Sequence, residues 1–277
     1  MEIKDLIICP RCKGELDDNC RCTKCGKQYE SRFGIYNVLY EDLGEEYKFS
    51  DWFFDEKDFQ RNVEEYSALR AEYQRCLSRE CIDAEKKQDR VIRSLVEKCS
   101  GTVLDLATGR GMFLKKIMEW NPALKVIGSD IDCRILAVTK VVRECGANVA
   151  FLGTDGRHIA LKDGSVDHVV SFVGLANMPE TERVISEIHR VLKKNGSFIY
   201  KGAFLDPGSR SYNDLKTRYN LAHVMDIDLL TSMFEEDGFA VERSEIVARG
   251  VWAENPYDMY PFAGDYNNYG VIEVRND

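Results

Sequence analysis

The chain has 277 residues, of which 44% are hydrophobic and 31% are charged, and its formal net charge is −9. This composition excludes a disordered chain and provides for one large core plus a small additional module. No stretch approaches the roughly 18 apolar residues that a membrane-spanning helix needs. Ten cysteines, together with first residues that do not resemble an export signal, predict a reducing, cytoplasmic location.

Four cysteines near the N-terminus form two C-x-x-C pairs, Cys9 with Cys12 and Cys22 with Cys25. Each pair can direct two sulfurs at one ion, and four thiolates prefer zinc to hard cations. The alternatives are a redox-active pair, which would need a thioredoxin-like domain, disulfides, which would need export, and plain reduced cysteines. We favour a metal site in a zinc ribbon over residues 1–45, with Cys20 outside the ligand set.

The ribbon is expected to end in a strand pair around Gly34, after which residues 46–98 lead to the rest of the chain. This connector is rich in charge and carries two runs of apolar residues at helical spacing. The first run comprises Phe59, Val63, Tyr66, Tyr73 and Leu77, and the second Val91, Ile92, Leu95 and Val96. The pattern predicts two helices that pack against a C-terminal domain at 99–277.

That domain begins with an apolar strand at 103–106 and a turn of small residues. Ala107, Gly109 and Gly111 leave room for backbone N–H groups to approach a ligand. A helical pattern follows at once, which is the context of a nucleotide-binding turn. A dinucleotide fingerprint would need a third small residue at Leu114, so that interpretation fails. A structural turn without a ligand remains the alternative.

Further strands and helices alternate along the chain, which predicts an α/β fold with a parallel sheet. Asp130 ends the second strand, 21 residues after Gly109, where an acid can hold ribose hydroxyls. Asp155 and Gly156 follow the third strand. The last two strands have no helical pattern between them and are expected to pair antiparallel at the sheet edge. The predicted strands are 103–106, 125–129, 148–152, 166–172, 197–200, 240–248 and 269–275.

These motifs together resemble class I S-adenosylmethionine-dependent methyltransferases, over roughly residues 100–277. The resemblance implies a Rossmann-like, seven-stranded methyltransferase sheet that binds S-adenosylmethionine. In the family the turn lines the methionine end of the cofactor, the acid after the second strand holds the ribose, and the acid after the third accepts from adenine. The aromatic ring of Phe172 is a further candidate, for the cationic sulfur. The implied cofactor-binding residues are Asp105, Ala107, Thr108, Gly109, Gly111, Asp130, Ile131, Asp155, Gly156 and Phe172.

The connector covers the cofactor mouth in many relatives, so Tyr66 or Tyr73 is a candidate to face the donor; simple packing is the alternative. The segment 177–180 lacks the prolines and the aromatic residue of the amino-methylating Asn-Pro-Pro-Tyr motif, and we interpret it as a helix start. No catalytic residue is assigned. His223, beside Tyr212 and Tyr219 in the sequence, is the best of four weak histidine candidates.

The acceptor is the open question. A zinc ribbon ahead of a class I domain resembles the layout of ribosomal-RNA guanine methyltransferases, which favours structured RNA, ribosomal or transfer, as the substrate. The net charge favours a small molecule slightly, because residues 9–34 carry six basic and four acidic residues while the rest of the chain is acidic. A third hypothesis is an adaptor that keeps the cofactor pocket and binds a protein partner through the ribbon. No membrane partner is expected.

Overall fold

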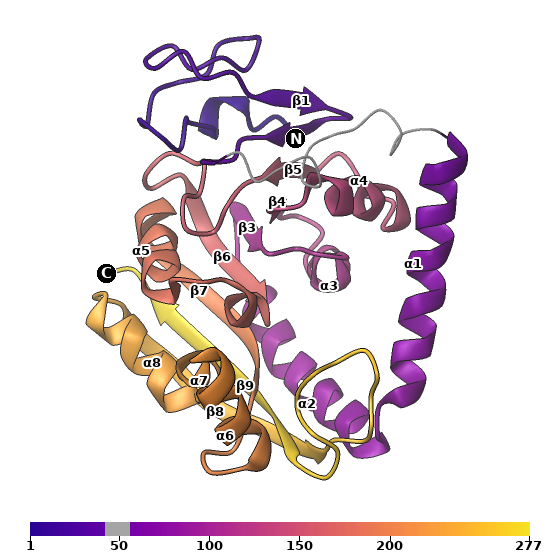
Figure 1. The fold of residues 1–277 in the computed structure, drawn as a ribbon. Helices are drawn as coiled ribbons and strands as arrows, with labels where there is room; N and C mark the ends of the chain where they lie inside the picture. The colour runs from indigo at the N-terminus through magenta and orange to yellow at the C-terminus, as the bar shows by residue number, and fades with distance from the viewer. Residues whose placement is uncertain (42–55) are drawn as a thin grey trace.

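A nine-stranded sheet runs through the computed structural model, which describes residues 1–41 and 56–277 (Figure 1). Its strand order is β1-β2-β5-β4-β3-β6-β7-β9-β8. The strands are β1 Glu30–Arg32, β2 Ile35–Asn37, β3 Thr102–Leu106, β4 Lys125–Asp130, β5 Val149–Gly153, β6 Val166–Phe172, β7 Leu192–Phe204, β8 Ala240–Val251 and β9 Tyr266–Arg275.

The middle of the sheet is parallel, from β2 through β5, β4, β3 and β6 to β7. At one end β9 pairs antiparallel with both β7 and β8, so the expected antiparallel pair is present. This arrangement confirms the predicted α/β, Rossmann-like fold. The expected number of seven strands is exceeded, because β2 pairs with β5 and extends the sheet by the N-terminal pair.

Helices cover both faces of the sheet because strand residues alternate between two apolar clusters. Val103 packs with α2, α3 and α4 on one face, whereas Leu104 packs with α5 and α8 on the other. Parallel strands buried on both faces require this double cover. The helices are α1 Glu56–Cys76, α2 Arg79–Val96, α3 Met112–Trp120, α4 Cys133–Val142, α5 Thr181–Val191, α6 Arg210–Tyr219, α7 Ala222–Met225 and α8 Ile227–Glu236.

The two helices expected in the connector are α1 and α2. Helix α2 packs on β7, β8 and β9 and buries six residues, among them Cys81, Gln88 and Ile92. Ser78 caps its first turn by accepting from the backbone N–H of Cys81 at 3.1 Å. The side chains of Phe59 and Tyr66 lie outside the described residues, so the expectation for Tyr66 stays a prediction.

The N-terminal module is joined to the sheet and is not a separate appendage. Besides the β2–β5 pairing, the backbone N–H of Ile8 donates to the carbonyl of Ala160 at 3.1 Å. Lys162 forms an ion pair with Glu15 at 3.1 Å. Buried Cys9 belongs to the same apolar cluster as the α5 side of the sheet. We therefore expect the folding of the N-terminal module to be coupled to that of the sheet edge.

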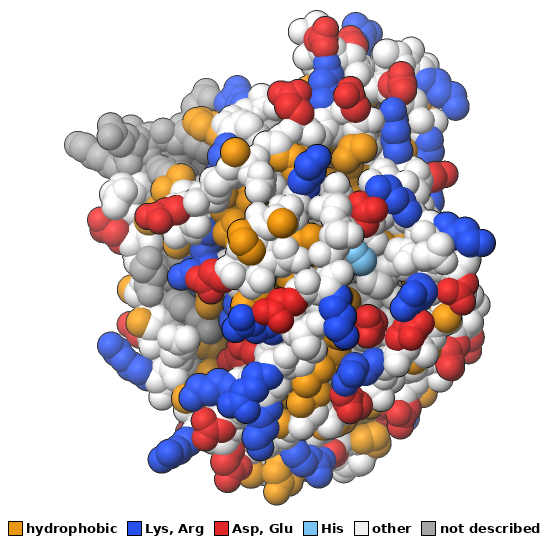
Figure 2. Space-filling model, turned by 180° about the vertical axis from the view of Figure 1, so that it is seen from behind, with side chains coloured by type: hydrophobic (Ala, Val, Ile, Leu, Met, Phe, Trp, Pro, Cys, Tyr) orange, Lys and Arg blue, Asp and Glu red, His pale blue; other side chains and the backbone are white. Residues whose placement is uncertain are grey.

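Over the described residues, no helix is both long and apolar enough to cross a membrane. Lys and Arg side chains are interspersed with Asp and Glu over most of the face drawn in Figure 2. The described part of that face therefore offers no broad basic surface of the kind that binds nucleic-acid phosphates.

Candidate functional site

The predicted cofactor-binding residues gather around a cavity of about 450 Å³ at the carboxyl ends of β3, β4 and β5, which we call the main cavity. Ligands of open α/β sheets bind at this edge. Eight of the ten predicted cofactor-binding residues line it, and Asp105 and Gly111 do not. The lining residues are Leu106, Ala107, Thr108, Gly109, Arg110, Met112, Phe113, Ser129, Asp130, Ile131, Thr154, Asp155, Gly156, Arg157, Phe172, Gly174, Asn177, Met178 and Pro179.

The turn after β3 has the backbone shape that its small residues permit. Ala107 has φ +58° and Gly109 has φ +49°, both in the left-handed region. Thr108 joins the turn to β4 by two hydrogen bonds. Its N–H donates to the carbonyl of Ser129 at 2.7 Å, and its hydroxyl accepts from the Ser129 N–H at 2.9 Å. The turn is thus held in place before any ligand enters.

Gly111 has a packing role beside the cavity. It caps α3 with φ +67°, and a Cβ atom built there would lie 2.4 Å from Cγ2 of Thr139 on α4. We expect Gly111→Ala to lower the free energy of unfolding by about 1–3 kcal/mol, because it adds backbone strain and a clash. Gly146→Ala is the matched control, since a Cβ there meets nothing within 4 Å. Urea unfolding of both variants checks this, and equal stabilities would contradict it.

Asp130 lies at the end of β4 with its carboxylate directed at the turn. The N–H of Gly109 donates to Oδ2 at 2.8 Å, and the N–H of Asp132 donates to Oδ1 at 3.1 Å. Burial raises the pKa of Asp130, and these backbone hydrogen bonds offset only part of that effect. Each oxygen retains a lone-pair direction, so the geometry leaves room for the hydroxyl donors expected from the sequence.

Asp155 is already engaged by a residue that the sequence reasoning missed. Arg157 Nη2 donates to Asp155 Oδ2 at 2.8 Å, and the Arg157 backbone N–H donates to Oδ1 at 2.9 Å. Burial raises the pKa of Asp155, but the hydrogen bonds from Arg157 outweigh it, and the pKa lies below its usual value. A ligand amino group would have to share this carboxylate with Arg157.

Asp105 is buried beneath the turn and 1% exposed. Its Oδ2 has no hydrogen-bond partner among the described residues. Burial is the main cause that raises the pKa of Asp105 to about 7. The carboxyl is thus mostly protonated below neutral pH, and it is buried beneath the turn.

The folded chain therefore holds a proton on Asp105 more tightly than the unfolded chain does. Where the folded state binds more protons, stability falls as pH rises, here between about pH 4 and pH 7. We expect Asp105→Asn to remove this decrease and to stabilise the chain above neutral pH by on the order of 2–4 kcal/mol. Urea unfolding across this interval tests the point, with exposed Asp228→Asn as the control. Parallel pH profiles for wild type and Asp105→Asn would refute it.

Segment 177–180 forms part of the cavity wall through Asn177, Met178 and Pro179, besides preceding α5 at Thr181. Gly156 packs closely against this segment, because a Cβ there would lie 2.5 Å from Met178 Sδ and would displace that side chain. No local motif marks Arg157 or Met178 as pocket residues. The one available signal for Arg157 was its spacing from Asp155, because an arginine two residues after an aspartate can reach the carboxylate.

Phe172 borders the cavity at the end of β6 and is 36% exposed. The Lys201 ammonium lies 4.3 Å from the centre of its ring. A cation is therefore already placed on this aromatic ring. The suggested contact of Phe172 with the cofactor sulfur remains a prediction, and it would have to use the part of the ring that Lys201 leaves open.

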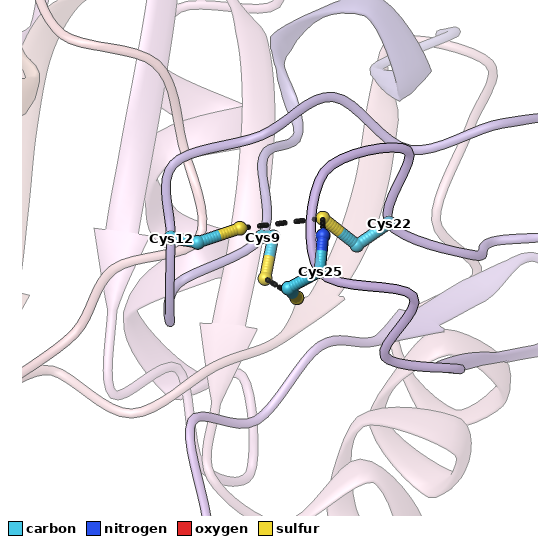
Figure 3. Close-up of side chains that lie close together, drawn as sticks. All are labelled: Cys9, Cys12, Cys22 and Cys25. Atoms are coloured by element: carbon cyan, nitrogen blue, oxygen red, sulfur yellow. Dashed lines mark hydrogen bonds between the residues drawn. The ribbon is translucent and has the colours of Figure 1, made fainter.

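The four N-terminal thiols converge from two loops (Figure 3). All four Sγ atoms lie within 4.8 Å of one another, with Cys9–Cys25 at 3.7 Å and Cys12–Cys22 at 3.4 Å. A tetrahedral zinc with Zn–S bonds of about 2.3 Å needs sulfurs about 3.8 Å apart, so the set fits this metal. Cys20 is not part of this group.

At Cys22, one of the four, local backbone structure favours the thiolate form that a metal needs. Burial raises the pKa of the Cys22 thiol, but backbone N–H groups of Cys25 and Lys24 outweigh burial and lower it to about 6. Gly14 is needed for the first loop, because a Cβ there would lie 2.7 Å from Cβ of Lys24 and 3.0 Å from Cys22 Sγ.

All four histidines have structural partners, and none lines the main cavity. His223 Nε2 lies 3.3 Å from Thr181 Oγ1 and His168 Nδ1 lies 2.8 Å from Ser197 Oγ. His189 contacts Asp237, and His158 stacks on Tyr40. Tyr73 lines a second cavity and not the main one.

The order of the seven strands from β5 to β8 and the cavity at their carboxyl ends define a class I, Rossmann-like methyltransferase fold. Residues 104–200 match the family described as "Methyltransferase domain". This match covers residues 104–200 only, and every residue that lines the main cavity falls inside it. The family and the fold support S-adenosylmethionine as the cofactor.

The chain resembles several characterised enzymes over part of its length. The demethylmenaquinone methyltransferase of Thermus thermophilus is 32% identical over 123 residues, covering 42% of this chain and 56% of that protein. A ubiquinone/menaquinone biosynthesis C-methyltransferase of Pasteurella multocida is 31% identical over 136 residues, covering 45% and 51%. The chain spans about half the length of these relatives. A Bacillus halodurans structure described as a methyltransferase superposes with TM-score 0.53 at 17% identity, covering 67% of this chain and 97% of that one, which shows the shared fold.

Proposed function

We propose that this protein is an S-adenosylmethionine-dependent methyltransferase with a small-molecule acceptor. The observation that carries the proposal is the main cavity, whose walls come entirely from the matched methyltransferase domain. When bound, the cofactor supplies an electrophilic methyl group on a sulfonium. The names of the curated relatives, which are quinone methyltransferases, favour a small acceptor.

The residues of the chain bind and orient this cofactor. The small residues of the turn from Ala107 to Gly109 leave room for the cofactor, and Asp130 offers carboxylate oxygens to the ribose hydroxyls. Ile131 and Met178 provide apolar wall for the adenine, beside the Asp155–Arg157 pair. Positioning of two reactants can by itself lower a barrier by about 7–11 kcal/mol, so the reaction has no need of a strong base.

Cys9, Cys12, Cys22 and Cys25 would hold one structural zinc ion, on the basis of their convergent sulfur atoms. A closed set of four thiolates leaves no open position for a substrate, so this metal would stabilise the fold and take no part in the transfer. The proposed domain division is a zinc ribbon at 1–45, a helical connector at 46–98 and the methyltransferase domain at 99–277.

Methyl transfer from labelled donor into separated small-metabolite and RNA fractions tests the proposed function. We expect label in the small-metabolite fraction and binding of S-adenosylhomocysteine by calorimetry. Label in ribosomal or transfer RNA, with binding that weakens steeply with salt, would establish the RNA alternative instead. Donor binding with no labelled product in any fraction would favour an adaptor.

A further inference from the structure

A second cavity, of about 280 Å³, adjoins the main cavity at Phe172, which lines both. We call the main cavity the donor cavity from here on, since it is the proposed site of the methyl donor. Its other walls come from α1, α2, the end of β7 and the segment between β8 and β9. That segment lies beside the end of α1 in Figure 1, and Tyr73 Oη donates to Asp258 Oδ2 at 2.7 Å to join the two. The lining residues are Tyr73, Leu77, Glu85, Gln88, Phe172, Val173, Gly202, Ala203, Met225, Trp252, Asp258, Tyr260, Pro261, Asn267 and Tyr269.

The two cavities differ in which part of the chain builds them. The donor cavity lies wholly within residues 104–200, the stretch that matches the methyltransferase domain. Only Phe172 and Val173 of the second cavity lie in that stretch. The walls of the second cavity therefore lie mostly outside the matched stretch, and their chemistry must be read from the residues of this chain.

Three lining side chains contain a buried polar atom without a hydrogen-bond partner in the described part of the chain. These atoms are Oε1 of Gln88, Oδ1 of Asn267 and Nε1 of Trp252. The three residues are 1%, 5% and 5% exposed, respectively. An unsatisfied buried polar group costs about 1–3 kcal/mol, so such groups mark places where a partner belongs.

The orientation of the Gln88 amide is fixed by its surroundings. Its Nε2 donates to the carbonyls of Gly202 and Gly270, both at 2.7 Å. Both amide hydrogens are thereby used, and the oxygen is left to accept. Together with Asn267 Oδ1, the cavity walls contain two free hydrogen-bond acceptors and, at Trp252 Nε1, one free donor, which suit a ligand with N–H donors and a lone pair.

The charged residues that line the second cavity also favour a ligand with N–H donors. Its described lining contains two acids, Glu85 and Asp258, and no Lys, Arg or His. Glu85 is neutralised by Lys201 at 3.1 Å and Lys116 at 3.2 Å. Asp258 is exposed at the mouth and has no ion-pair partner among the described residues. Five aromatic residues line the remaining walls, and aromatic faces attract cations.

We propose that this second cavity binds the methyl acceptor and that the acceptor is a small primary or secondary amine. The inference rests on the proposed methyltransferase function and deepens it. Before the transfer the bound ammonium loses one proton to water, and the lone pair that this leaves on nitrogen then forms the new N–C bond. The bond from the methyl carbon to sulfur breaks with its electron pair on sulfur, and the surplus proton on nitrogen leaves to water. The uncompensated negative charge of Asp258 weakens the binding of anionic acceptors.

Calorimetry on the full chain saturated with S-adenosylhomocysteine tests the proposal. Phenethylamine is compared with phenethyl alcohol and hydrocinnamate, and butylamine with butanol and pentanoate, so that only the head group changes. We expect at least one amine to bind about tenfold more tightly than its alcohol, and the carboxylates to bind more weakly still. Asp258→Asn should reduce amine affinity about fivefold, the size expected for one partly solvated charge, without changing alcohol affinity. Glu254→Gln, an exposed acid of the same segment outside the lining, is the matched control.

The outcomes separate this inference from the function on which it rests. Absence of S-adenosylhomocysteine binding in the same sample would refute the methyltransferase proposal itself. Normal donor binding, with no amine preferred over its alcohol or with an unchanged affinity in Asp258→Asn, would refute the amine site alone. Tighter binding of an alcohol than of its matched amine would assign the cavity to an uncharged ring acceptor instead.

Discussion

Asp130→Ala is expected to weaken S-adenosylhomocysteine binding by about 30- to 100-fold while the chain remains folded. Hydrogen bonds to a charged group contribute about 1.5–3 kcal/mol, and the carboxylate would be lost from beside the ribose. The variant also loses the contacts that Gly109 and Asp132 make with Asp130, so the turn would hold its shape less accurately. Calorimetry and thermal unfolding measure the two effects separately.

Asp132→Ala is the matched control, because Asp132 neighbours the site but does not line the cavity. Its carboxylate caps α4 by accepting from Arg134 N–H at 2.9 Å. Loss of this cap should cost about 1 kcal/mol of stability and leave donor affinity almost unchanged. If Asp130→Ala and Asp132→Ala weaken donor binding equally, the ribose-binding role of Asp130 is wrong.

Cys22→Ser is expected to remove the bound zinc and to destabilise more than the first forty residues. Metal binding and folding are one equilibrium in such sites, with apparent free energies on the order of 10 kcal/mol in isolated modules. From the sequence, the loss would stay within the N-terminal module. The β2–β5 pairing and the Ile8–Ala160 hydrogen bond extend it to the loop that carries Asp155, so donor affinity should fall as well.

Cys20→Ser serves as the comparison, since Cys20 is buried in the same module but lies outside the four-thiol group. It should keep its zinc, measured by mass spectrometry of the native protein, and its donor affinity. Hydrogen exchange then maps the extent of the effect in Cys22→Ser. Unchanged protection of β5 in that variant would show that the module folds independently of the sheet.

Elements set by local pattern could be predicted from the sequence. Buried parallel strands such as β5 read as continuous apolar runs, and the small residues from Ala107 onward marked the turn between β3 and α3. The acids at the ends of β4 and β5 followed from the strand assignments, since carboxyl ends of parallel strands meet at one edge. Eight of ten expected positions accordingly line the donor cavity.

Features that depend on packing between distant segments could not be predicted. The attachment of β2 to β5 involves only three paired positions, too few to mark an edge pairing in the sequence. The second cavity joins Tyr73, Phe172 and Asn267, which are far apart along the chain and belong to no common motif. Asp105 does not line the cavity, because successive side chains of a strand point to opposite faces of the sheet. This too could not be predicted from the motif alone.

The pairing of β2 with β5 also protects the sheet. Without the N-terminal module, β5 would be an outer strand with a row of unpaired backbone N–H and C=O groups, which invites association with other chains. The module replaces it with β1, a strand of three residues, all exposed, that carries Glu30 and Arg32. Short charged borders of this kind resist strand addition. A shortened chain that lacks the cysteine module should therefore aggregate, even though it retains every residue that lines the donor cavity.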